Sequence, residues 1–454
     1  MKFKKVIAVS MTAAMALSML TACGGGDTAA DSNVSDSSNS ESADASGGEN
    51  AASGSTDGLE VKIWDSMQKD GIETICNEWS ATSGIPVNVE VVNWDSYWTL
   101  LEAGVSGGEM PDVFWSHSNY IQKYMDAEVL LPLNDYIEKD ETMDLNNFFP
   151  DIVELYTNDD GTHYAIPKDY DTIALFYNKK MFDDAGLSYP DDTWTWEDLY
   201  ENAKQLTKED GSQYGIGINT DLNQESYYNI IYSYGGYVIS DDHKKSGMDD
   251  PKTIEAMEMW GKVIKDCMPP QTTLAEADAT DLFTSGVTAM QLAGSWRIAS
   301  LKSFDEASDW AVAQIPYCDQ NGNGQCDEGE RVSIYNGLGW AAPADCADPD
   351  AAYSLISYLC SKEGQTRQAE LGVTMSAYMG TSDSWKNSTD LWDLSPFLDE
   401  ANGSAKLVIY PYSRSTIWAE DMKQQLVAAW NDTSLMAQVC QEIADSMNAQ
   451  LAQE

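Results

Sequence analysis

The pattern of apolar and polar positions predicts alternating strands and helices at the start of the folded region. Apolar residues alternate with polar ones over 59–63 and 87–91, and 112–115 is a third short strand pattern. Residues 72–79 and 97–105, between these strands, carry apolar side chains at helical spacing. The order strand, helix, strand, helix, strand predicts a parallel sheet whose faces are covered by helices.

The central part of the chain repeats this alternation with different lengths. Further strands are predicted at 164–166, 171–177, 289–292, 310–315 and 332–335. Helix starts are predicted where a capping residue precedes an apolar pattern, at Thr195, Asp250 and Asp348. Residues 419–453 have a mostly helical pattern. Two α/β units joined by more than one crossing of the chain account for this order.

The N-terminus resembles a lipoprotein signal. Three lysines within the first five residues precede an apolar run, 6–20, which is too short to span a bilayer and is typical of a secretory signal peptide. The run ends in Leu20-Thr21-Ala22-Cys23, which resembles the bacterial lipobox; an ordinary signal peptide with a chance cysteine is the alternative. We expect residues 1–22 to be removed and Cys23 to carry a lipid that anchors the protein at the extracellular face of the cell membrane.

Residues 23–58 have a composition that cannot build a core. Of the 35 residues from Gly24 to Gly58, 22 are Gly, Ser or Ala and seven are acidic, with no base and no aromatic ring. The root-mean-square reach of such a chain is about 30–35 Å. We therefore expect a flexible acidic tether between the lipid anchor and a folded body that starts near Leu59.

The net charge narrows the choice of partners. The chain has 74 Asp and Glu against 26 Lys and Arg, a formal net charge of −48 at pH 7. So acidic a body repels phosphate backbones and anionic headgroups, which excludes nucleic acid and leaves the lipid anchor as the expected membrane contact. Its ligands are expected to be neutral or cationic.

Tryptophan residues stand at or near the carboxyl ends of the first three predicted strands. They are Trp64, Trp94 and Trp115. Ligands of open α/β sheets bind at that edge, and aromatic platforms suit the apolar face of a sugar ring. Core packing is the alternative for each ring, but three such rings in consecutive strands favour a binding edge.

Four motifs occur in a set order along the chain. They are Gly107 to Trp115 (GGEMPDVFW), Tyr177 to Phe182 (YNKKMF), Trp194 to Leu199 (WTWEDL) and Gly294-Ser295-Trp296. Together they resemble the signatures of the family 1 extracellular solute-binding proteins, the maltose-binding-protein-like sugar-binding subunits of ABC importers. The resemblance extends over nearly all of the chain from Leu59 onward.

The resemblance implies an α/β, two-lobed periplasmic-binding-protein-like fold with a multi-crossing hinge. Lobe 1 is expected in residues 59–169 and about 337–385, and lobe 2 in about 172–334 and 388–454. The lobes of such a protein close on a mono- or oligosaccharide and deliver it to an ABC permease. A monomer without enzyme activity is expected.

The resemblance and the strand ends together suggest a set of ligand-binding residues. They are Trp64, Asp65, Lys69, Trp94, Trp115, Asp171, Tyr227, Trp296 and Trp418. Aromatic rings stack on the C–H face of a pyranose, and carboxylates accept hydrogen bonds from its hydroxyls. Core positions for the aromatic rings and a hinge cap for Asp171 are the alternatives.

A second specific motif is the segment 319–330, DQNGNGQCDEGE. It matches the calcium-loop pattern D-x-[DN]-x-[DN]-G-x₅-E. The expected ligands are Asp319, Asn321, Asn323, the backbone carbonyl of Gln325, Asp327 and Glu330. Because predicted strands flank the loop, we expect a hairpin stapled by structural Ca²⁺ and not a calcium sensor. A polar hairpin tip without metal is the alternative.

Two other functions are compatible with the sequence. A surface carbohydrate-active enzyme would use Asp171 and Glu225 as an acid/base pair. A sugar sensor would present the ligand to a receptor instead of a permease. Cys318 and Cys326 flank half of the calcium-type loop, and both a disulfide and free thiols are compatible with their spacing.

Overall fold

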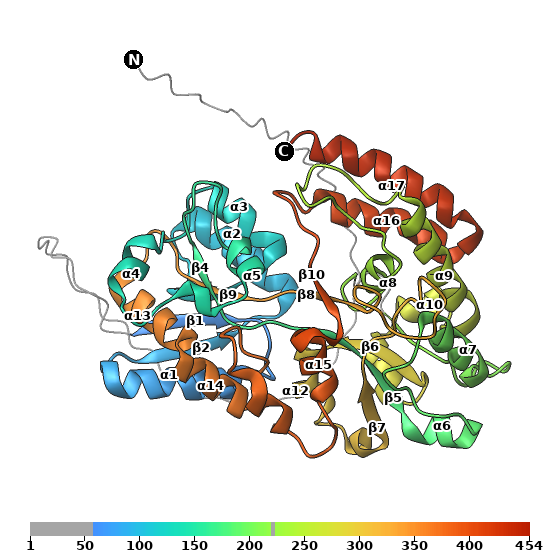
Figure 1. Cartoon of the computed structure of the whole chain (residues 1–454). Coiled ribbons are helices and arrows are strands. Elements are labelled where there is room, and N and C mark those ends of the chain that lie inside the picture. Colours follow the sequence, from blue (N-terminus) through green and yellow to red (C-terminus); the bar gives the residue numbers. More distant parts are fainter. Residues whose placement is uncertain (1–57, 219–222) are drawn as a thin grey trace, which may run out of the picture. The chain divides into compact units, whose positions relative to one another are not determined.

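A computed structural model describes residues 58–218 and 223–454. The predicted signal peptide, Cys23 and the predicted tether up to residue 57 lie outside these residues. In the described part, three sheets and the helices around them form the fold (Figure 1).

The first sheet has five strands in the order β2-β1-β3-β9-β4. Its strands are β1 (Leu59–Ile63), β2 (Val87–Val91), β3 (Val113–Ser116), β4 (Ala165–Pro167) and β9 (Gly339–Ala341). β1 pairs in parallel with both β2 and β3, which confirms the predicted alternation of strand and helix. β9 is antiparallel to both β3 and β4, so a strand from far along the chain completes the sheet of lobe 1.

Helices that precede or follow these strands in the chain belong to lobe 1. They are α1 (Lys69–Ser83), α2 (Trp94–Gly107), α3 (Ser118–Asp126), α4 (Asn134–Lys139), α5 (Pro150–Leu155), α13 (Pro349–Cys360) and α14 (Lys362–Glu370). The predicted cap at Asp348 is confirmed, since its side chain accepts from the N–H of Ala351 and Pro349 opens α13. α1 ends at Gly84, whose φ of 77° is readily adopted by glycine.

Lobe 2 is built on two smaller sheets. One is antiparallel in the order β6-β5-β7, with β5 (Ile173–Asn178), β6 (Met290–Gly294) and β7 (Trp310–Ala313). In the other, β8 (Val332–Tyr335) pairs in parallel with β10 (Lys406–Ile409). β4 and β5 belong to different sheets, as do β8 and β9, so the chain passes between the sheets of the two lobes at these two places.

The helices of lobe 2 alternate with these strands or follow them. They are α6 (Lys179–Ala185), α7 (Trp196–Leu206), α8 (Tyr227–Ser233), α9 (Pro251–Cys267), α10 (Gln271–Leu274), α11 (Ala279–Thr284), α12 (Ile298–Leu301), α15 (Ser395–Asp399), α16 (Ile417–Asn431) and α17 (Met436–Leu451). The predicted caps at Thr195 and Asp250 are confirmed, and Thr195 forms a reciprocal capping box with Asp198. The helical tail is divided in two at residues 432–435.

Two of the three crossings between the lobes in the described residues run side by side and form the hinge; the third lies between α14 and α15. Residues 168–172 lead from β4 to β5, and residues 336–338 lead from β8 to β9. The backbone N–H of Asp171 donates to the carbonyl of Asn336 at 3.0 Å, and the N–H of Asn336 donates to Asp171 Oδ1 at 2.9 Å. This reciprocal pair joins the two crossings.

A buried ion pair holds the start of the first crossing. Lys168 Nζ lies 2.6 Å from Asp169 Oδ2 and donates to Gln68 Oε1 at 2.9 Å. The ammonium also lies 4.3 Å from the centroid of the Trp115 ring. Asp169 Oδ1 accepts from the N–H of Leu338 in the second crossing at 2.7 Å. The hinge is therefore connected to the start of α1 and to the core of lobe 1.

The prediction of a hairpin around residues 319–330 is wrong. β7 pairs with β5 and β8 pairs with β10, so the strands that flank the loop belong to different sheets. An isolated bridge between Tyr317 and Arg331 closes the loop, and the N–H of Cys318 donates to the Glu330 carbonyl at 3.2 Å. Cys318 and Cys326 are free thiols. Alternation along a strand reveals its apolar face but not its partner.

Glu400 is a fully buried acid in lobe 2. Its side chain is 0% exposed, and Oε1 accepts from the N–H of Ile315 at 2.9 Å. Burial raises the pKa of this carboxyl to about 8 from an ordinary value of 4.5, although Ile315, Ser333 and Arg331 act in the opposite direction. The folded state therefore favours the protonated acid.

We expect Glu400→Gln to make the protein relatively more stable at alkaline pH. The pKa of Glu400 is higher in the folded protein than in the unfolded chain. The contribution of Glu400 to the free energy of unfolding is therefore fully present below about pH 4.5 and is lost as the pH rises through about 8. Glutamine cannot ionise and escapes this loss. Urea unfolding at pH 5, 7 and 9 should show the free-energy difference move in favour of the variant by about 2–4 kcal/mol. A difference that stays constant with pH would contradict the burial of an acid at this site.

Candidate functional site

A cluster of aromatic rings lies at the carboxyl end of β1 and around the starts of α2 and α3. This aromatic wall consists of Trp64, Trp94, Trp98, His117 and Tyr120. The ring centroids of Trp64 and Trp94 are 5.1 Å apart, and Trp98 stacks on Tyr120 at 4.1 Å. Trp94 is 36% exposed. The predicted residues Trp64 and Trp94 thus lie together at the expected edge of the sheet.

His117 connects the aromatic wall with the hinge. Its Nδ1 accepts from the N–H of Asn119 at 3.2 Å and caps α3. Burial lowers the pKa of the imidazole to about 4, so the ring is neutral at physiological pH. Because Nδ1 accepts, Nε2 carries the proton, and it lies 3.3 Å from the side-chain amide of Asn336. When the Asn336 side-chain amide is oriented with Oδ1 toward this proton, Oδ1 accepts a hydrogen bond from His117 Nε2. Oδ1 otherwise has no hydrogen-bond partner.

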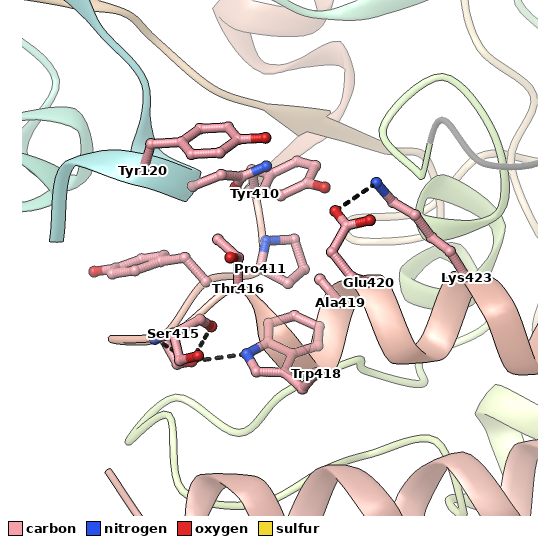
Figure 2. A pocket seen from close by; sticks show the side chains of 12 residues that line it. Tyr120, Tyr410, Pro411, Ser415, Thr416, Trp418, Ala419, Glu420 and Lys423 are labelled. Carbon is pink, nitrogen blue, oxygen red and sulfur yellow. Dashed lines mark hydrogen bonds and ion pairs between the residues drawn. The ribbon is translucent and has the colours of Figure 1, made fainter. Parts of the chain in front are cut away.

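A pocket lies between the aromatic wall and lobe 2 (Figure 2). Its cavity volume is about 20 Å³, so in this arrangement the two walls leave room for little more than a water molecule. Lobe 1 contributes Asn119 and Tyr120 of α3, and lobe 2 contributes the loop before α16 and the first turns of that helix. Tyr120 belongs both to the wall and to the pocket, so the aromatic cluster continues into the site.

The lobe 2 side of the pocket combines rings with polar groups. Trp418 is 2% exposed and donates from Nε1 to Ser413 Oγ at 2.7 Å. Lys423 Nζ lies 3.1 Å from Glu420 Oε1. Tyr410 is buried, and Asn119 of the opposite lobe hydrogen-bonds its hydroxyl. Aromatic faces with hydroxyl, amide and carboxylate groups are suited to a polyhydroxylated ligand.

Asp171 lies in the hinge and is half-buried. Its Oδ1 accepts from Gln224 Nε2 at 2.6 Å and from the N–H of Asn336 at 2.9 Å. Burial and the neighbouring charge of Asp169 raise the pKa of Asp171 well above its usual value, and Glu225 adds to this effect. Asp171 is therefore part of the hinge structure, and a direct role in binding stays a prediction.

Glu225 is held by an arginine of the same lobe. Arg297 donates from Nε to Glu225 Oε1 at 3.0 Å and from an η nitrogen to Oε2 at 2.9 Å. The N–H of Gly294 also donates to Oε1 at 3.0 Å. The carboxylate of Asp65 in lobe 1 adds to the rise in the Arg297 pKa, which is caused mainly by Glu225. A carboxylate held in this way is a poor proton donor or acceptor for catalysis.

Trp115 and Tyr227 do not face open space, which contradicts their assignment as ligand contacts. Trp115 is 0% exposed and packs against Trp64 and Trp340 in the core of lobe 1. Tyr227 is also 0% exposed, and its hydroxyl donates to Asn223 Oδ1 at 2.7 Å. Strands and helices distant in sequence cover both rings, and local sequence patterns do not record that burial.

Three other predicted residues have intermediate exposure. Asp65 accepts from the N–H of Met67 at 2.8 Å and from Gln68 Nε2 at 3.0 Å, which orders the turn before α1. Lys69 is the first residue of α1. Trp296 follows β6, and its ring lies against the backbone of Gly294. A Cβ added at residue 294 would lie 2.0 Å from the Trp296 ring. A ligand contact by Asp65, Lys69 or Trp296 stays a prediction.

Several residues of the pocket were not predicted from the sequence. They are Asn119, Tyr120, Tyr410, Glu420 and Lys423. Tyr410-Pro411-Tyr412, a few residues before the predicted ligand contact Trp418 and the helical pattern of 419–453, was the available signal. Tyr120 had no such signal, because its exposure depends on the stacking of Trp98 beneath it.

The comparison with protein families decides the assignment. Residues 74–393 match the family described as bacterial extracellular solute-binding protein. The chain belongs to this family. This confirms the resemblance drawn from the four motifs, and the matched segment includes the hinge and most of both lobes.

Several known proteins are similar to this solute-binding protein in sequence or in structure. A maltotriose-binding protein of Pyrococcus abyssi is 28% identical over 259 residues, 56% of this chain and 53% of the relative. The sn-glycerol-3-phosphate-binding periplasmic protein of Rhizobium meliloti is 23% identical over 277 residues, 58% of this chain and 63% of the relative. The structure of an ABC substrate-binding protein of Listeria monocytogenes in complex with cycloalternan superimposes with a TM-score of 0.77 at 20% identity, covering 87% and 98% of the two chains. The two-lobed fold is thereby confirmed.

Among residues 58–218 and 223–454 of this solute-binding protein, no helix is long and apolar enough to cross a bilayer.

We expect Arg297→Met to destabilise lobe 2, because it leaves the buried carboxylate of Glu225 unpaired. The loss in the free energy of unfolding should be about 2–4 kcal/mol, measured by urea unfolding. Adding Glu225→Gln should recover much of it. Arg367→Met, which removes a more exposed ion pair with Glu78, is the control and should cost less than about 1 kcal/mol. Equal losses for the two single variants would contradict a structural role for the Glu225 pair.

Proposed function

We propose that this protein binds a carbohydrate, a mono- or oligosaccharide, between its two lobes and delivers it to an ABC permease. The observation that carries the proposal is the pocket between α3 and α16, with Tyr120 and Trp418 on its two sides. Stacking on aromatic faces and hydrogen bonds from a few polar groups suit a neutral, polyhydroxylated ligand. The maltotriose-binding relative and the cycloalternan complex support this class of ligand.

The charges around the site favour a neutral sugar over a phosphorylated ligand such as that of the Rhizobium relative. Lys423 is paired with Glu420, Arg297 with Glu225, and Lys168 with Asp169. A phosphate would have to compete with these carboxylates for each cation and would meet the field of a chain with net charge −48.

A carbohydrate-active enzyme is a less suitable interpretation of the same site. Hydrolysis by two carboxylates requires an acid and a base that are free to exchange protons with the substrate. Glu225 is engaged on both oxygens by Arg297, and Asp171 accepts two hydrogen bonds within the hinge. We therefore assign binding without chemistry to this protein.

The anchor completes the proposal. The sequence of residues 1–23 supports export and lipid attachment at Cys23 on the extracellular face of the cell membrane. A monomer at this place would meet the transmembrane subunits of an importer. Mass spectrometry of the membrane fraction, with Cys23→Ala as the comparison, tests the lipid directly.

We expect maltotriose, but not sn-glycerol 3-phosphate, to raise the melting temperature. A ligand at a hundred times its Kd adds about 2.7 kcal/mol to the free energy of unfolding. Differential scanning fluorimetry with neutral oligosaccharides, glycerol phosphate, peptides and polyamines makes the comparison. A shift by phosphate esters, peptides or polyamines without any shift by sugars would refute the carbohydrate assignment.

We also propose that residues 319–330 bind a structural Ca²⁺. Asp319 accepts from the backbone N–H groups of Gly322 and Gly324, both at 2.8 Å, which wraps the turn around its carboxylate. Glu330 is 4% exposed and accepts from the N–H groups of Gln320 and Asp327, each at 2.9 Å. These hydrogen bonds bring the first and last proposed ligands into one compact turn, as the motif requires.

The donor set makes this a mixed oxygen site. Among the described residues, no three His, Cys, Asp or Glu side chains form a group that would hold a metal by themselves. A cation here would depend on the amides of Asn321 and Asn323 and on the carbonyl of Gln325. Oxygen donors of this kind suit Ca²⁺ better than they suit transition metals.

We expect about 1–10 mM Ca²⁺ to raise the melting temperature and chelation to lower it, because the affinity of extracellular calcium modules is about 10⁻⁴–10⁻³ M. Glu330→Gln should abolish this dependence. The control is Glu328→Gln, which changes an exposed residue of the same loop that is not a predicted ligand. This variant should retain the calcium dependence of the melting temperature. A melting temperature that chelator leaves unchanged in the wild type would remove the proposed role of calcium.

A further inference from the structure

Arg414 connects the two lobes beside the pocket. It lies in the loop between β10 and α16 of lobe 2. Its guanidinium forms ion pairs with Asp126 at the end of α3, at 3.4 Å, and with Asp159 in the turn before β4. Both carboxylates belong to lobe 1. In the part of the chain that the structure describes, the ion pairs of Arg414 are the ones that bridge from one lobe to the other.

The loop that carries Arg414 is held firmly from the lobe 2 side. The carboxylate of Glu454 accepts from the N–H of Arg414 at 3.0 Å and from Ser413 Oγ at 2.9 Å. Ser413 Oγ in turn accepts from Trp418 Nε1. The backbone at Arg414 is therefore held in place by Glu454 and, through Ser413, by a ring of the pocket.

The same elements form both the ion pairs and the pocket. Ser413 and Ser415, on either side of Arg414, line the pocket. Helix α3 supplies the pocket residues Asn119 and Tyr120 from its first turn and Asp126 from its end. The distance between α3 and the loop at Arg414 thus determines both the width of the pocket and whether the ion pairs form.

The negative charge of the protein makes the ion pairs of Arg414 important for closure of the lobes. The two lobes carry most of the chain's net charge of −48 and therefore repel each other, which opposes closure. A cation of lobe 2 placed between two carboxylates of lobe 1 replaces part of that repulsion by attraction. Because a ligand between the lobes contacts both walls only when they are close, its apparent affinity scales with the population of the closed arrangement.

We propose that Arg414, with Asp126 and Asp159, is an interlobe clasp that raises ligand affinity by favouring the closed arrangement without contacting the ligand. Arg414 is thus a positioning residue for the binding function proposed above. Exposed ion pairs of this kind are individually weak, so loss of both pairs should weaken binding about twofold to thirtyfold, mainly through faster dissociation.

The experiment compares Arg414→Gln with a matched control, Arg367→Gln. Arg367 is exposed to a similar extent, 37% against 44%, and also pairs with two carboxylates, Glu78 and Glu370, but entirely within lobe 1. One readout is the distance between the lobes in the full chain without ligand, by fluorescence energy transfer between dyes at exposed positions 138 and 431. The other is the dissociation rate of maltotriose, used as the probe.

We expect Arg414→Gln to lengthen the interlobe distance and to speed maltotriose dissociation, while Arg367→Gln changes neither. Arg414→Lys, which keeps the charge, should retain most of the wild-type behaviour. The pair Asp126→Asn and Asp159→Asn should reproduce Arg414→Gln and add little when combined with it. Asp159 is 85% exposed, so its substitution tests the clasp even if another variant folds poorly.

The outcomes separate the clasp from the proposed function. If Arg414→Gln and Arg367→Gln give equal distances, Arg414 is not a clasp. If Arg414→Gln changes the interlobe distance but not the dissociation rate of maltotriose, the clasp does not determine ligand affinity. That part of the proposal then fails. If the wild type binds no maltotriose or other sugar, the carbohydrate assignment fails, and the distance measurement still decides the clasp.

Discussion

The fold depends on the close pairing of the two chain crossings at 168–172 and 336–338. Reciprocal hydrogen bonds between Asp171 and Asn336 join them, and a Cβ at residue 337 would come within 2.4 Å of the Asp169 carbonyl oxygen, so glycine is required there. The buried Lys168–Asp169 pair connects the same crossing to lobe 1. Charges so deeply buried are tolerated only when each has partners, and here the partners are hinge atoms, the Gln68 amide and the Trp115 ring.

The proposed binding site is arranged around this hinge. His117 contacts Asn336 of the second crossing through one nitrogen and caps α3 through the other. The aromatic wall is therefore positioned relative to the hinge, and α3 presents Asn119 and Tyr120 to the pocket. On the other side, α16 and the loop before it contribute the second wall. A site formed by two lobes can be widened or closed by movement at the hinge, which suits capture and release better than chemistry.

Acidity affects several parts of the structure in different ways. Glu400 avoids its burial penalty by favouring the protonated form, whereas Glu225 stays paired with Arg297. In the loop 319–330, the carboxylates of Asp319 and Glu330 are satisfied by backbone N–H groups. The cations near the pocket are likewise engaged by carboxylates. A neutral ligand leaves all these pairs intact, and this is the physical basis for preferring a sugar.

The sequence by itself determined strands β1 to β8 and the helices between the first three of them, the caps at Thr195, Asp250 and Asp348, the membership of the family, and the presence of rings at Trp64 and Trp94 near one sheet edge. These features depend on neighbouring residues, so periodicity and spacing reveal them. Only the tertiary structure decided that β9 completes the first sheet, that β7 and β8 lie in separate sheets, that Trp115 and Tyr227 are buried, and that Tyr120 and Tyr410 line the pocket. The reason is that strand partners and the exposure of a ring are set by segments far apart in the chain, and local patterns hold no record of them.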